Sequence, residues 1–178
     1  LPRRLFRILR GTVLGSRRSL RLLAGTLARV ALGLLLQPRR LQLGLDLLDE
    51  MAAQGPGATV DLAEAFAHPL PFRVICELLG VPEQDRPPLH DGFGVLMRPW
   101  GDDPPPEAVR ASDAIVGYLG ELVAAKRRSP GDDLVSAMIA AEEEGARLSH
   151  EQVVVTTMTF ITAGFESTNN LLTNIAHA

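Results

Sequence analysis

Residues 149–178 read SHEQVVVTTMTFITAGFESTNNLLTNIAHA, and this long stretch contains no proline. Its first part, Val153 to Thr162, is dense in β-branched residues, which taken alone favour a strand. A run of this length without a turn signal is much longer than a normal strand, and Ser149 with Gln152 forms a helical capping box at its start. We therefore predict one long helix, apolar nearly all round and hence buried.

The middle of this helix holds the run Ala163-Gly164-Phe165-Glu166-Ser167-Thr168. Glycine costs about 1 kcal/mol inside a helix, and a buried carboxylate costs several kcal/mol unless it is paired or protonated. Two unfavourable choices side by side predict a functional site. Small side chains would let a ligand approach the backbone, Ser167 could bond back to a carbonyl one turn earlier, and Glu166 could deliver protons. Helix packing is the alternative use of the small residues, and an ion pair is the alternative use of Glu166.

The rest of the chain carries helix boundaries and predicts an all-α fold. Leucine, alanine and valine dominate, and there is one tryptophan and one tyrosine. We expect helices that end at Gln54-Gly55-Pro56-Gly57, open at Asp61 with Glu64, span PFRVICELLG to a left-handed Gly80, cover residues 107–128, and run from Asp132 to Gly145. Seven prolines between Pro82 and Pro106 predict short helices joined by loops.

Cysteine and histidine usage excludes several classes of protein. The single cysteine, Cys76, cannot form an internal disulfide, and there is no zinc-type spacing of cysteine and histidine. The four histidines form no metal-binding pair. A reducing, cytoplasmic location is the simplest expectation.

Residues 1–45 differ from the remainder in charge, because they hold ten arginines and no acidic residue. Three interpretations stay open: a cationic amphipathic helix or transit peptide, a basic arm for nucleic acid, and translation of a GC-rich gene out of frame. The arm lacks interleaved aromatics, so we expect no nucleic acid partner. The apolar stretch 22–36 contains Arg29 and is shorter than the ~20 residues of a membrane span. We divide the chain into this segment of doubtful origin and a domain at 46–178.

The run AGFEST at 163–168 resembles the central helix signature of the cytochromes P-450. PLPFRVICELLGVP at 69–82 and PGDDLVSAMIAAEEEGARLSHEQ at 130–152 resemble the segments that precede that helix. The likeness extends over about residues 47–178. It implies a bacterial-type haem-thiolate monooxygenase and an all-α fragment of the cytochrome P-450 fold.

The resemblance also implies roles for individual residues. Ala163, Gly164 and Ser167 would line the oxygen-binding groove against haem, and Glu166, Ser167 and Thr168 would form the catalytic proton relay. Ser167 stands where threonine is commoner. Phe160, Ala163 and Leu96 would touch the substrate, with Leu96 in a proline-rich and glycine-rich substrate roof at 89–107.

The family's iron needs a cysteine thiolate from a Phe-x-x-Gly loop, and a later helix carries a Glu-x-x-Arg pair. We expect both beyond Ala178, because both ends of the chain look cut and Cys76 reads as a small buried hydrophobe. No residue here is then a metal ligand, and the isolated chain would be inactive. The parent would insert one oxygen atom of O2 into an organic small molecule, using electrons from NAD(P)H through ferredoxin and ferredoxin reductase. The alternative is a non-enzymatic helical interaction module with a basic arm for a membrane or a partner.

Overall fold

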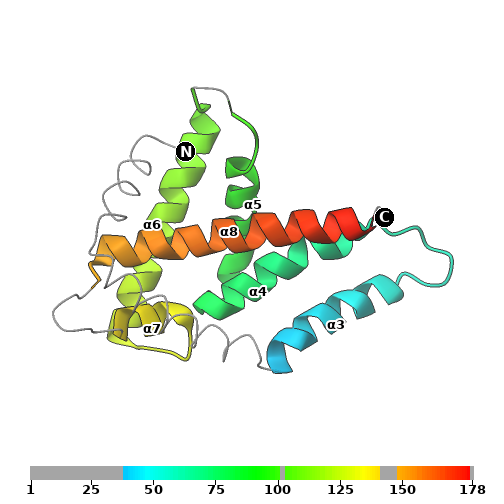
Figure 1. Cartoon of the computed structure of the whole chain (residues 1–178), viewed down its shortest axis with the longest axis horizontal. Helices are drawn as coiled ribbons and strands as arrows, with labels where there is room; N and C mark the ends of the chain where they lie inside the picture. Colours follow the sequence, from blue (N-terminus) through cyan, green and yellow to red (C-terminus); the bar gives the residue numbers. More distant parts are fainter. Residues whose placement is uncertain (1–37, 101–102, 141–147, 177–178) are drawn as a thin grey trace.

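The computed structural model describes residues 38–100, 103–140 and 148–176, which form helices and loops without strands (Figure 1). The all-α prediction is therefore confirmed over the described ranges. The α-helices are α3 (Pro38–Ala52), α4 (Pro69–Leu79), α5 (Arg86–Leu96), α6 (Pro106–Arg128), α7 (Leu134–Ala140) and α8 (His150–Ala176), joined by the π-helical turn Ala63–Ala67 and the 3-10 turn Glu83–Asp85.

Helix α8 is the longest element, and α4 and α6 pack against it. Its start is the predicted capping box: the Ser149 amide donates to Gln152 Oε1 at 2.8 Å, and the Gln152 amide donates to Ser149 Oγ at 3.2 Å. Both side chains thus satisfy amides that the first turn leaves without helical partners.

Other predicted boundaries are confirmed with small shifts. Asp61 Oδ1 accepts the amides of Ala63 and Glu64 at 2.9 and 3.2 Å, and α4 begins at Pro69. It ends at Gly80, whose φ of 69° is left-handed as predicted.

The predicted cap of α7 was wrong by one residue. Asp133, and not Asp132, lies directly before the helix, and its Oδ1 accepts the Ser136 amide at 2.8 Å. A side chain in the N-cap position is the one that can reach the free amides of the first turn, so Asp133 caps the helix and Asp132 does not. The predicted end at Gly145 lies outside the described residues.

The boundary expected after Leu45 falls inside α3, so one helix crosses it. Residues 1–37, and with them the interpretations of the arginine-rich segment, lie outside the described part of the chain. None of the described helices is long and apolar enough to cross a membrane.

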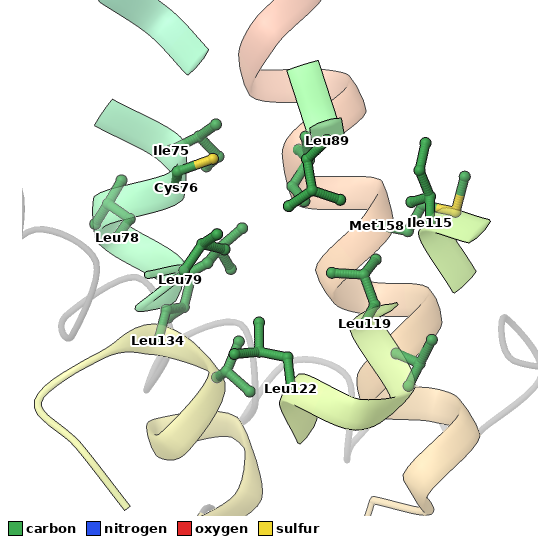
Figure 2. Packing of buried hydrophobic residues seen from close by; sticks show 14 of the residues in the cluster. Ile75, Cys76, Leu78, Leu79, Leu89, Ile115, Leu119, Leu122, Leu134 and Met158 are labelled. Carbon is green, nitrogen blue, oxygen red and sulfur yellow. The ribbon is translucent and has the colours of Figure 1, made fainter. Parts of the chain in front are cut away.

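The core is aliphatic, as the composition predicts, and lies between α4, α6 and α8 (Figure 2). Leu89 of α5 and Leu134 of α7 also belong to this core. Figure 2 shows Cys76 directed into this cluster, where it is fully buried. Its members include Ile75, Leu78, Leu79, Ile115, Leu119, Leu122 and Met158.

An ion pair joins the end of α6 to the start of α7, beside the end of α4. Lys126 Nζ lies 2.6 Å from Asp133 Oδ2, and these side chains are 18% and 4% exposed. A Cβ added at Gly80 would lie 2.6 Å from the Asp133 carboxylate and from Lys126 Nζ. Gly80 is therefore required both for its left-handed backbone and for the space beside this pair.

Candidate functional site on the open face of α8

Helix α8 changes its environment halfway along. Val153, Thr157 and Ile161 have no exposed surface, whereas Ala163 is exposed and Leu171 is 59% exposed. The predicted all-round burial is therefore wrong: Thr159 is exposed even in the first half, and most of the second half is exposed or half-buried. Helices α4 and α5 contact one side of the second half through Ile75, Phe72 and His90, and the described residues leave its other side uncovered.

The structure places two of the predicted site residues together on this open face. Ala163 and Ser167 are both exposed and lie one turn apart, and the Ser167 hydroxyl donates to the Ala163 carbonyl at 2.7 Å. Phe160, half-buried, borders the same face one turn before Ala163. Thr168 is exposed as well, but one residue of helix rotation turns it about 100° from Ser167. The Glu166 side chain lies outside what the structure describes.

Gly164 faces a different direction. A Cβ added there would lie 3.4 Å from Ile75 Cδ1 on α4, an ordinary van der Waals contact. Gly164 therefore lies against α4, which matches the packing alternative, while Ala163 keeps the open position. Ala163 thus faces the open side of α8, whereas Gly164 faces α4.

Threonines in the first half of α8 show why a strand-favouring sequence is helical here. Each donates its hydroxyl to the carbonyl four residues earlier, as the buried Thr157 does to Val153 at 2.8 Å. A buried hydroxyl without a partner would cost about 1–3 kcal/mol. The others that do so are Thr156, Thr159 and Thr162.

Leu96 is the last residue of α5 and, like Phe160, is half-buried against the rim of the core. Substrate contact by either side chain stays a prediction. Three surface hollows of about 580, 390 and 550 Å³ have no lining residue on α8. They are therefore separate from the face that carries Ala163 and Ser167.

Cys76 lies on α4 with 0% of its surface exposed. Burial raises the pKa of its thiol to about 12, so the thiol stays protonated at neutral pH. Cys76 also packs within the hydrophobic cluster with no exposed surface, so it has no open side on which a haem iron could approach. Among the described residues there is no cluster of three side chains that could hold a metal ion.

The sequence pattern did not single out Phe165, yet its ring contacts side chains of two other helices. It meets Phe72 of α4 edge to face, with ring centroids 5.8 Å apart, and His90 of α5 at 6.0 Å. No spacing rule links residues so far apart in the chain. The only sequence signal was an aromatic residue beside Gly164 in a motif otherwise made of small and polar residues.

No family model matches the chain, but the curated proteins that resemble it include cytochromes P450. Cytochrome P450 107B1 of Saccharopolyspora erythraea is 43% identical over 140 residues, which cover 78% of this chain and 33% of that protein. Cytochrome P450 monooxygenase PikC of Streptomyces venezuelae is 39% identical over 150 residues, covering 81% of this chain and 34% of that protein. The chain thus spans about a third of the length of the curated relatives it matches.

The solved structures that resemble this chain include cytochromes P450 as well. The mixed-function P450 MycG has a TM-score of 0.75 with 33% identity, over 88% of this chain and 39% of that one. The LnmZ cytochrome P450 hydroxylase from Streptomyces atroolivaceus has a TM-score of 0.73 with 29% identity, over 92% of this chain and 45% of that one. Since sequence and fold point the same way over most of its length, the chain belongs to the cytochrome P450 family.

Proposed function

We propose that the protein carrying this chain is a monooxygenase that inserts one oxygen atom of O2 into an organic small molecule, and that the open face of α8 forms one wall of its oxygen-activating site. The observation that carries this proposal is that Ala163 and Ser167 are exposed side by side on a helix whose opposite side is buried in the core. The curated relatives include a vitamin D(3) 25-hydroxylase and a mycinamicin IV hydroxylase/epoxidase, which supports oxygenation as the reaction class.

The family's cofactor is haem, and the α8 face has the properties of a wall for it. The side chain at 163 is a single methyl group, and Leu171 adds apolar surface, 59% exposed, two turns further along. A flat apolar ring can approach such a surface closely. Bound haem would supply the iron at which dioxygen is reduced, while its thiolate ligand must come from a cysteine other than Cys76.

The Ser167 hydroxyl is the described group best placed to move a proton on this face. Its hydrogen is directed to the Ala163 carbonyl at 2.7 Å, which leaves the oxygen lone pairs able to accept a hydrogen bond from the open side. Rotation about the Cα–Cβ bond would exchange that partner for dioxygen. We propose Glu166 and Thr168 as the groups that resupply the proton, and Ala163 and Gly164 as the residues that shape the groove.

Phe160, Ala163 and Leu96 remain the proposed substrate contacts. Electrons would come from NAD(P)H through ferredoxin-type partners, and the lone buried cysteine is consistent with a cytoplasmic location. Family membership gives no support to the alternative of a non-enzymatic interaction module.

The test uses the full-length gene product, with whatever sequence flanks these residues, loaded with haem and supplied with a ferredoxin system. Labelled dioxygen should place one labelled atom in an organic product, and the reduced protein should give the thiolate-haem carbon monoxide band. The purified 178-residue chain should not give that band. A full-length protein with neither band nor labelled product would contradict the proposal.

A further inference from the structure

Aromatic rings from three helices meet behind the motif of α8. Phe72 of α4 is the central ring, and His90 of α5 meets it edge to face with centroids 5.0 Å apart and planes at 79°. Phe165 of α8 packs on Phe72 at 5.8 Å and 82°, and Phe93 of α5 on Phe72 at 6.4 Å and 58°. His90 also reaches Phe165 at 6.0 Å, so each of these two rings contacts the other as well as Phe72.

Phe165 is two residues from Ala163 and two from Ser167. At 3.6 residues per turn this puts its ring about 200° around the helix axis from both, on the far side of α8 from the open face. The ring is 9% exposed, in agreement with that placement. Whatever holds the Phe165 ring therefore also sets the direction in which Ala163 and Ser167 point.

Helix α8 also packs on α6 and on the turn Ala63–Ala67, but the other described contacts of the motif residues themselves are less directional than ring pairs. Gly164 has no side chain, and its neighbour Ile75 is an aliphatic side chain at van der Waals distance. Ala163 and Ser167 are exposed, and their mutual hydrogen bond is internal to the helix. Edge-to-face ring pairs, in contrast, have a preferred orientation.

We propose that Phe72 and His90 are positioning residues for the reaction, which hold Phe165 and thereby fix the rotation of α8 at Ala163 and Ser167. This inference rests on the proposed function. A rotation of about 15° moves an atom about 4 Å from the helix axis by about 1 Å, and a displacement of that size can lower the rate of a reaction about 100-fold. A small loss of ring packing would therefore have a measurable effect on oxygen use.

The first test needs no haem. Amide hydrogen exchange in the purified chain is compared between the segment 163–168 and the distant α6 segment 119–125. Phe72→Leu and His90→Ala should speed exchange at 163–168 by about 2- to 13-fold more than at 119–125, the range expected for loss of an aromatic pair. His90→Phe keeps a ring and should restore the original ratio.

Phe93→Leu is the matched control. Phe93 is fully buried and contacts Phe72, but it has no ring contact with Phe165. Its loss should destabilise the core without a preferential effect on 163–168. An unchanged exchange ratio in Phe72→Leu, or the same change in Phe93→Leu, would overturn the proposal.

The second test measures product formed per O2 consumed in the full-length, haem-loaded protein. Phe72→Leu and His90→Ala should lower this ratio several-fold while substrate affinity changes less than twofold, and His90→Phe should restore it. An unchanged ratio in an active protein would overturn the positioning role alone. A wild-type protein without the carbon monoxide band and without product would instead remove the proposed function, while the exchange result would still report on the ring cluster.

Discussion

Replacing Gly80 by alanine should be among the most destabilising single-methyl additions available in the described structure. Gly80 has a φ of 69°, and the left-handed conformation costs an L-residue about 1–2 kcal/mol. In addition, the new Cβ would lie 2.6 Å from the Asp133 carboxylate and Lys126 Nζ. The Lys126 ammonium lies at the end of a flexible side chain and could shift. Asp133 could not, because its side chain is 4% exposed and its Oδ1 accepts the Ser136 amide at 2.8 Å.

Disrupting a buried ion pair costs about 3–5 kcal/mol when one partner is left unpaired, and a displaced pair that stays partly solvated costs less. We expect Gly80→Ala to lower the free energy of unfolding by about 3–5 kcal/mol in total. That is a large share of the 5–15 kcal/mol typical of a whole domain.

Gly55→Ala is the matched control for the backbone term. Gly55 has a φ of 91°, also positive, but a Cβ there would meet nothing within 4 Å. Urea denaturation of the purified chain should show a loss of about 1–2 kcal/mol for Gly55→Ala, and clearly more for Gly80→Ala. Equal losses in the two variants would refute the argument that the Lys126–Asp133 pair occupies the space beside Gly80.

Three further predictions concern the core and one helix end. The Cys76 thiol should resist alkylation in the native chain at neutral pH and react at the rate of a free thiol after unfolding, because burial raises its pKa to about 12; rapid native-state alkylation would contradict this. Burial and the hydrogen bond to Asp85 at 2.9 Å raise the pKa of Tyr118, so its contribution to stability is fully present below its ordinary value of about 10 and is lost as pH rises above it. Denaturation at a series of alkaline pH values should show this loss in the wild type and a smaller one in Tyr118→Phe. Ser149→Ala should cost about 1 kcal/mol of unfolding free energy by removing the cap on the Gln152 amide, and a cost near zero would show that the capping box contributes little.

Local rules predicted most helix boundaries, because the signals lie within a few residues of one another. The capping box at Ser149 and Gln152 and the left-handed Gly80 are examples. Even the difficult helix, with its strand-favouring threonines, was predicted from its length and cap. The error of one residue at Asp133 arose because two adjacent aspartates are equivalent in sequence and differ only in which one lies directly before the helix.

The site was predicted less completely, because its geometry depends on contacts between distant segments. The motif residues were found from their unusual types, but the division between Ala163 on the open face and Gly164 against Ile75 needed the position of α4. The contact between Phe165, Phe72 and His90 joins three helices, and no local pattern encodes it. Burial of the second half of α8 was also overestimated, since an apolar composition does not reveal which surface covers it.

Exchange of the Ser167 hydroxyl tests whether the open face of α8 takes part in oxygen activation. In the full-length, haem-loaded protein, Ser167→Thr keeps the hydroxyl and Ser167→Ala removes it. Thr159→Ala is the control, because Thr159 is exposed on the same helix, makes the same type of back-bond to Val155 at 2.8 Å, and lies about 12 Å along the axis. Ser167→Ala should lower the product formed per O2 consumed about 10-fold or more, whereas Ser167→Thr and Thr159→Ala should preserve it. An unchanged ratio in Ser167→Ala, or an equal fall in Thr159→Ala, would contradict this prediction.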